Sequence, residues 1–306
     1  MTLMAQIENL KNKISGKISF NESLSKLSWF NLGGPAKILF RPKNLQELSI
    51  FLKEIKKIKE INKIKVLGAG SNTLIRDGGF DGIIIKFGKS FSHISLFDPN
   101  IIIAGASVLD KNVSSFALEN SLSGFEFLSC IPGTIGGAVR MNSGCYKEDI
   151  SGILLSLQAM DYNGNIKVIQ SSDIKFHYRG SGIDENLIFI SATFKGKKDN
   201  KLNIQEKINN FVEKKKLTQP SKIKTCGSTF KNPENKKAWK LIKDSGCVGM
   251  KVGDAQISQK HCNFFVNNGN AKSEDLEKLI YQVKNKVLDK TGTNLELELQ
   301  IIGKKL

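Results

Sequence analysis

Two glycine-rich segments, each following a short apolar run, constrain the fold of this chain more than any other feature of its sequence. The first, residues 66–82, reads VLGAGSNTLIRDGGFDG, and the second, residues 127–146, reads FLSCIPGTIGGAVRMNSGCY. Glycines between strands let the backbone approach a ligand closely and let amide N–H groups face an anion. Neither segment matches a dinucleotide-binding fingerprint or a P-loop. We expect the first to bind a pyrophosphate, with a plain turn as the alternative. We expect the second to contact a flat cofactor, with a tight buried loop as the alternative.

The rest of the chain combines helical and strand patterns, which predicts an α+β fold. Asn44 followed by Glu47 resembles a helix start, and DYNGN at 161–165 predicts a hairpin. The polar run GKKDNKLN at 196–203 is the best candidate for a domain boundary. Helices are predicted near the N-terminus and over 44–58, 108–122, 204–217, 237–243 and 273–288, and strands over 36–40, 64–67, 82–87, 101–104, 154–160, 166–169, 187–194, 263–266 and 295–302.

The net charge of +17 admits three interpretations. The protein could bind nucleic acid, act on anionic small molecules such as nucleotides, or carry lysines on solvated faces. Lysines recur along the chain and few aromatic residues lie among them, so solvated faces account for most of the charge. No apolar run reaches the roughly 18 residues of a membrane span, and a signal-peptide pattern is lacking, so we expect a cytoplasmic protein.

Cysteines and arginines are both informative because they are few. The five cysteines lack the spacing of a zinc site, so we expect buried free thiols and no metal. Four of the 46 basic residues are arginine, and Arg76, Arg140 and Arg179 lie in polar, glycine-rich segments. A guanidinium can clamp a carboxylate or phosphate with two hydrogen bonds. We expect these arginines where geometry matters, with chance as the alternative.

Two further segments could carry chemistry. CGSTFKNP at 226–233 offers Ser228 as a nucleophile or proton donor, although a turn serine is the simpler interpretation. No G-x-S-x-G motif surrounds Ser228, so a hydrolase triad is unsupported. In LELELQIIG at 295–303, Glu296 and Glu298 alternate with apolar residues and share a strand face. Such a face is usually solvated, and a functional carboxylate is the alternative.

Taken in order, WFNLGGPA at 29–36, GAGSN, IPGTIGGAV, the Tyr178–Arg179 pair, CGSTFKNP and the C-terminal glutamate resemble one family. It is the UDP-N-acetylenolpyruvoylglucosamine reductase (MurB) family of peptidoglycan synthesis, in the type that lacks an inserted tyrosine-bearing loop. The resemblance implies the PCMH-type FAD-binding fold of the vanillyl-alcohol-oxidase superfamily over residues 1–198, with lobes of about 1–75 and 76–198. A smaller α+β substrate-binding domain would follow at 199–306.

The resemblance also implies the residues of the site. Those that contact FAD are Gly68, Ala69, Gly70, Ser71 and Asn72 at the pyrophosphate, and Ile131, Gly133, Thr134 and Gly137 near the flavin. The catalytic residues are Arg179, Ser228 and Glu298. The substrate contacts are Lys216, twelve positions before the serine, and Asn232. Val248 stands where the family often has a lysine, which leaves one phosphate contact open.

The implied chemistry is a two-step reduction. NADPH reduces the FAD, and the reduced flavin gives a hydride to C3 of a UDP-linked enolpyruvyl amino sugar. Ser228 then protonates C2 while Arg179 and Glu298 stabilise the enediolate. No histidine lies near residues 29–36, so non-covalent FAD is expected.

The expected protein is a cytoplasmic monomer without nucleic-acid or membrane partners. One alternative is another flavin oxidoreductase of the superfamily, which does not account for CGSTFKNP together with Glu298. The other is a basic nucleic-acid-binding protein, which does not account for the glycine-rich loops.

Overall fold

The computed structural model describes residues 3–58 and 63–306, which form two compact units. The first unit contains Met1–Phe20, Ile38–Ala69 and Gly82–Glu213, and the second contains Asn21–Lys37, Gly70–Asp81 and Lys214–Leu306. Each unit is therefore built from more than one stretch of chain. The predicted boundary between residues 198 and 199, which separates a cofactor-binding from a substrate-binding domain, stays a prediction.

A four-stranded sheet with the order β1-β2-β5-β3 belongs mostly to the first unit, with two helices against it. The strands are β1 (Lys17–Ser23), β2 (Pro35–Arg41), β5 (Phe80–Ile85) and β3 (Ile64–Val66), and the helices are α1 (Leu3–Leu10) and α2 (Leu45–Ile55). Phe40 of β2 stacks on Phe51 of α2, with ring centroids 3.8 Å apart. The apolar face of α2 thus closes this core, as its helical periodicity predicts.

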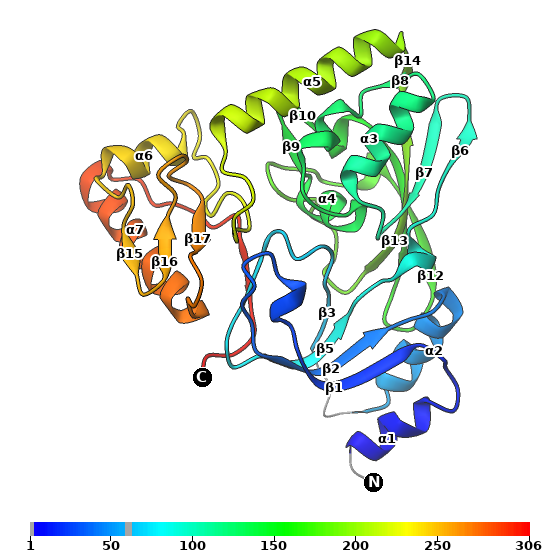
Figure 1. Cartoon of the computed structure of the whole chain (residues 1–306). Helices are drawn as coiled ribbons and strands as arrows, with labels where there is room; N and C mark the ends of the chain where they lie inside the picture. Colours follow the sequence, from blue (N-terminus) through cyan, green and yellow to red (C-terminus); the bar gives the residue numbers. More distant parts are fainter. Residues whose placement is uncertain (1–2, 59–62) are drawn as a thin grey trace. The chain divides into compact units, whose positions relative to one another are not determined.

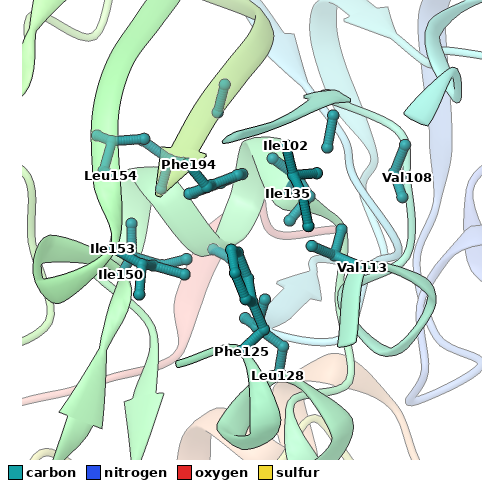
Figure 2. Close-up of a cluster of buried hydrophobic side chains, with 14 of the residues drawn as sticks. Ile102, Val108, Val113, Phe125, Leu128, Ile135, Ile150, Ile153, Leu154 and Phe194 are labelled. Carbon is teal, nitrogen blue, oxygen red and sulfur yellow. The ribbon is translucent and has the colours of Figure 1, made fainter. Parts of the chain in front are cut away.

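The first unit also holds an antiparallel five-stranded sheet with the order β12-β11-β13-β7-β6 (Figure 1). The strands are β6 (Ile94–Asp98), β7 (Ile101–Gly105), β11 (Leu154–Met160), β12 (Ile166–Gln170) and β13 (Ile188–Lys195). The helices are α3 (Asp110–Glu119), α4 (Ile135–Met141) and α5 (Lys201–Thr218), of which α5 belongs to this unit only as far as Glu213. Phe125, Ile135 and Phe194 are among the side chains that meet in its core (Figure 2). The turn at 161–165 forms as predicted, with Gly164 at a φ of 74°. Short ladders pair β9 (Gly144–Cys145) with β10 (Glu148–Asp149), and β8 (Leu122–Ser123) with β14 (Lys197–Lys198).

The second unit has a three-stranded antiparallel sheet with the order β15-β16-β17 (Figure 1). Its elements are β15 (Lys251–Val252), β16 (Ala255–Ile257), β17 (Phe265–Asn267), α6 (Ala238–Asp244) and α7 (Ser273–Thr291). A separate parallel pair joins β4 (Thr73–Ile75) to β18 (Gln300–Ile302), so segments more than 200 residues apart lie side by side. The predicted strand over 295–302 is therefore regular only in its last three residues. None of the helices in residues 3–58 and 63–306 is both long and apolar enough to cross a membrane.

Glu47 is a polar residue buried near the start of α2. Asn44 accepts a hydrogen bond from the Glu47 amide at 2.9 Å, which caps the helix as predicted. The Glu47 carboxylate itself accepts hydrogen bonds from the Ser15 amide, the Ser15 hydroxyl and the Lys43 amide. Burial raises the pKa of Glu47, but these hydrogen bonds outweigh burial and hold the pKa below its ordinary value.

We expect Glu47→Gln to lower the free energy of unfolding by about 1 to 2 kcal/mol at pH 7, because charged acceptors form stronger hydrogen bonds. A depressed folded-state pKa stabilises the protein above the unfolded-state pKa, and this contribution disappears as the pH falls through the folded-state value. Urea unfolding between about pH 7 and pH 3 should therefore show the two proteins converging in acid. A constant difference at every pH would contradict this role.

Candidate active site

The two glycine-rich segments meet within the first unit. A Cβ added to Gly68 would lie 2.7 Å from the hydroxyl oxygen of Thr134, closer than real side chains approach. Thr134 is buried and stands directly before α4, and Leu109 pairs with it as an isolated antiparallel bridge. Glycine at 68 thus permits the first segment to touch the start of α4 in the second.

Adjacent glycines on α4 have different surroundings. A Cβ at Gly136 would contact Ala106 at 3.2 Å, so this glycine serves close packing against the chain itself. A Cβ at Gly137 would meet nothing nearer than Thr134 at 3.9 Å, and Gly137 is exposed. Packing within the protein does not explain glycine at 137. An open backbone of this kind fits a flat ligand that lies directly against the helix.

Arg179 lies in a tight turn of the first unit. His177 and Gly180 exchange backbone hydrogen bonds of 3.0 and 3.1 Å, which leaves Tyr178 and Arg179 at the tip. Arg179 has a φ of 60°, a conformation that a non-glycine residue rarely adopts outside turns and functional sites. Its guanidinium donates to the Gly144 carbonyl at 3.1 Å and lies over the Tyr178 ring, 4.9 Å from the centroid. The turn therefore directs Arg179 toward the end of the second glycine-rich segment.

Asn142 connects this turn to α4. It ends the helix in the left-handed conformation and donates through Nδ2 to the His177 carbonyl at 3.3 Å. Its Oδ1 accepts from the Ser151 amide at 3.0 Å. The amide side chain is almost fully buried. The positions of α4 and of the Arg179 turn are therefore coupled through one side chain.

Cys226 joins the first glycine-rich segment to CGSTFKNP within the second unit. Gly70 has a φ of 71°, and a Cβ there would lie 1.9 Å from the Leu27 carbonyl oxygen. The Cys226 thiol donates to the carbonyls of Gly70 and Thr73 at 3.5 and 3.6 Å. Burial raises the pKa of Cys226 to about 12, so the thiol stays protonated and can keep donating. The sequence placed this cysteine in the motif but gave no sign of its partners.

Ser228 and Glu298 lie on paired segments of the second unit. The amides of Glu298 and Leu299 both donate to the Thr229 carbonyl, at 2.9 and 3.4 Å, which is the pattern of a β-bulge. Asn72 donates from Nδ2 to the Glu298 carbonyl at 3.0 Å, and its own carbonyl accepts from the Gln300 amide. The structure thus brings Asn72, Ser228 and Glu298 together from three distant motifs.

The two glutamates of LELELQIIG differ in their surroundings. The Glu296 side chain is 76% exposed and forms an ion pair of 3.6 Å with Lys231. Glu298 is half-buried, and its backbone belongs to the bulge. Bulges change the direction of a side chain beside functional sites. The solvated interpretation therefore suits Glu296, and Glu298 is the candidate for function.

Ser228 itself is half-buried and follows a permissive glycine. Gly227 has a φ of 77°, and an added Cβ there would meet no atom within 4 Å. Ser228 pairs with Phe264 as an isolated bridge, so its backbone is held from the opposite side as well. Glycine at 227 is needed for the backbone conformation and not for close packing.

The two predicted substrate contacts are both exposed and lie in the second unit. The Lys216 carbonyl, near the end of α5, accepts a hydrogen bond of 2.6 Å from the Lys260 side chain. Asn232 Oδ1 accepts from the Ala238 amide at 3.0 Å and thereby fixes the start of α6. Asn232 thus has a structural role beside any contact with a ligand.

His261 is packed against an aromatic neighbour in the second unit. Its ring packs edge-on against Phe264, with centroids 4.7 Å apart. Burial lowers the pKa of His261, so the ring is neutral at physiological pH. Its Nδ1 accepts a hydrogen bond from the Asn263 amide at 3.3 Å.

Two of the arginines that the sequence singled out hold other parts of the chain in place. Arg76 forms a bidentate ion pair with Glu277, with distances of 2.8 and 2.9 Å. Arg140 donates to the carbonyls of Ile183, Asp184 and Leu187, and its guanidinium stacks 3.9 Å from the centroid of the Phe189 ring. Geometry thus explains arginine at both positions, but the partners are protein groups.

Comparison with known proteins first defines the class. Residues 36–170 match the FAD binding domain family, and residues 219–302 match the C-terminal domain of UDP-N-acetylenolpyruvoylglucosamine reductase. The chain is therefore an FAD-binding protein with the predicted PCMH-type fold and a C-terminal α+β domain.

Individual relatives then define the family. A UDP-N-acetylenolpyruvoylglucosamine reductase of Pelagibacter ubique is 52% identical over 97% of this chain and 98% of its own length. One from Orientia tsutsugamushi is 43% identical over 96% of this chain and 97% of its own. The crystal structure of the enzyme from Thermus caldophilus has a TM-score of 0.80 and 29% identity, and covers 94% of this chain and 99% of that one. The chain belongs to the UDP-N-acetylenolpyruvoylglucosamine reductase family, which confirms the resemblance found in its sequence.

We expect Arg140→Lys to lower the free energy of unfolding by about 1 to 3 kcal/mol, because an ammonium cannot serve three carbonyls and stack on a ring. Urea unfolding of apoprotein measures this change. Lys167→Arg, on the exposed face of β12, is the control and should stay within about 0.5 kcal/mol of wild type. Equal stability of Arg140→Lys and wild type would contradict the role of the guanidinium.

Proposed function

We propose that the protein reduces UDP-N-acetylenolpyruvoylglucosamine to UDP-N-acetylmuramate with electrons from NADPH. The observation that carries this proposal is the junction in the second unit where Asn72 hydrogen bonds to Glu298 beside the segment of Ser228. It unites one motif expected at the cofactor with two expected at the reacting carbons. Membership of the family supports the same reaction.

The residues of this chain fit FAD. The exposed backbone at Gly137 gives a flat ring system access to α4, and Gly70 has a positive φ of 71°, which anion-binding loops often contain. The proposed diphosphate contacts are Gly68, Ala69, Gly70, Ser71 and Asn72, and the proposed flavin contacts are Ile131, Gly133, Thr134 and Gly137. Bound FAD, held without a covalent bond, supplies hydride transfer from NADPH to the enolpyruvyl group.

Ser228 is the proposed proton donor. Addition of hydride to C3 of the enolpyruvyl group leaves negative charge at C2, conjugated with the carboxylate. The O–H bond of Ser228 breaks as the C2–H bond forms, and solvent returns a proton to the serine oxygen. Serine is a weak acid, but the carbanion is basic enough to take its proton.

Arg179 and Glu298 are proposed to stabilise the enediolate before that proton arrives. A fixed cation lowers the energy of developing negative charge, and a turn-held guanidinium needs little reorganisation. Glu298 assists by hydrogen bonding, while Lys216 and Asn232 bind the sugar nucleotide. We take the enzyme to be a cytoplasmic monomer that requires no nucleic-acid or membrane partner.

Replacement of the proton donor should separate the two half-reactions. In Ser228→Ala we expect NADPH to bleach the flavin at close to the wild-type rate, because that step needs no proton at C2. Turnover with the sugar nucleotide should fall by at least about 100-fold. Anaerobic stopped-flow absorbance measures both steps.

Ser221→Ala, an exposed serine of the same unit, is the control and should behave as wild type. Normal turnover of Ser228→Ala would remove Ser228 from the mechanism. Loss of flavin reduction as well would mean that the substitution disturbs the cofactor.

The neighbouring glutamates provide a matched pair of variants. We expect Glu298→Gln to lower kcat by about 100- to 1000-fold, the range found for a group that stabilises developing charge. Glu296→Gln should stay within about twofold, since its exposed ion pair contributes little. Steady-state rates at saturating substrate distinguish the two. Equal losses would indicate a structural role for the strand, and no loss in Glu298→Gln would contradict its assignment.

A further inference from the structure

Lys86 is a half-buried cation that the proposed mechanism leaves without a role. It directly follows β5, and its amide donates to the Phe40 carbonyl at 2.9 Å, which fixes the backbone. Its side chain is half-buried, and Nζ donates a hydrogen bond to the carbonyl of Gly68. Gly68 begins the GAGSN motif, so the ammonium group lies against the backbone of that loop.

Within residues 3–58 and 63–306, Lys86 forms no ion pair with an acidic side chain. Burial, and after it the positive charge of Arg41, lower the pKa of Lys86. Partial burial of an ammonium that has no acidic partner among these residues destabilises the folded protein. A bound anion would balance the charge of this ammonium and so explain its position.

The position of Lys86 indicates which anion this is. Gly68, which accepts its hydrogen bond, also touches Thr134 at the start of α4. The ammonium therefore lies where the two glycine-rich segments meet within the first unit. The FAD diphosphate is the anionic part of the cofactor for which these segments are proposed.

We propose that Lys86 is a ligand of the FAD diphosphate and supplies positive charge that the side chains of GAGSN lack. The inference rests on the proposed assignment of Gly68–Asn72 to the diphosphate. Lysine suits this position because a compact ammonium neutralises phosphate oxygens as a point charge. The alternative is a structural lysine whose only task is to hold the Gly68 carbonyl.

These two roles predict opposite effects on the apoprotein. A diphosphate ligand is an uncompensated charge until FAD binds, so Lys86→Met should leave the Tm of the apoprotein unchanged or raise it. If Lys86 is structural, Lys86→Met should lower the Tm of the apoprotein. Lys65→Met, on the neighbouring strand β3, removes an exposed lysine that pairs with Glu185 at 3.0 Å and is the control.

The decisive measurement is the Kd of apoprotein for FAD and for riboflavin, which lacks the diphosphate, at several NaCl concentrations. We expect Lys86→Met to weaken FAD binding about 10- to 100-fold, the strength of a charge-assisted hydrogen bond. Riboflavin binding should change less than about twofold. The variant should also show a shallower dependence of log Kd on log salt. Lys65→Met should match wild type in the Kd for FAD, the Kd for riboflavin and the salt dependence.

An unchanged Kd for FAD in Lys86→Met would overturn the inference. Equal weakening of FAD and riboflavin, together with a lower apoprotein Tm, would overturn it in favour of the structural role. Wild-type protein that binds riboflavin as tightly as FAD would instead refute the assignment of the GAGSN loop to the diphosphate. Failure of the inference and failure of the proposed function are therefore distinguishable.

Discussion

The parallel pairing of β4 with β18 is the interaction on which the second unit of this protein depends. Gln300 donates to the Asn72 carbonyl, and Asn72 returns a hydrogen bond to the carbonyl of Glu298. Parallel strands need a long connection, and here the intervening chain supplies the rest of the fold. The same contact fixes the GAGSN loop, the bulge at Glu298 and, through Thr229, the segment that bears Ser228. One short ladder thus sets the positions of residues from three motifs.

Glycine serves different purposes at different positions of the proposed site. At Gly70 it permits a positive φ and a backbone approach that any side chain would block. At Gly136 it permits close packing within the protein, whereas at Gly137 it leaves the helix backbone open. These differences separate glycines that shape the loops from one that can admit a cofactor. The sequence alone does not distinguish these three glycines.

Basic residues of this chain likewise differ in their surroundings. Most of the lysines lie on solvated surfaces, where they constrain little. Arg76 and Arg140 bind protein groups, and Arg179 is held in a strained turn. Lys86 is half-buried beside Gly68 and has no acidic partner within residues 3–58 and 63–306. The functional meaning of a basic residue in this chain therefore follows from its enclosure and its partners, and not from the net charge.

The sequence by itself determined the α+β class, the family and most of the regular elements. Hydrophobic periodicity and turn residues act locally, so α2 with its Asn44 cap and the hairpin at 161–165 formed as predicted. The order of the motifs likewise carried the resemblance that the relatives confirm. Only the tertiary structure decided that the strand at 295–302 is interrupted by a bulge, that Arg140 is structural, and that Cys226 and Lys86 contact the first glycine-rich loop. These features depend on hydrogen bonds between segments distant in sequence, and no local pattern specifies which carbonyl a side chain will meet once the chain is packed.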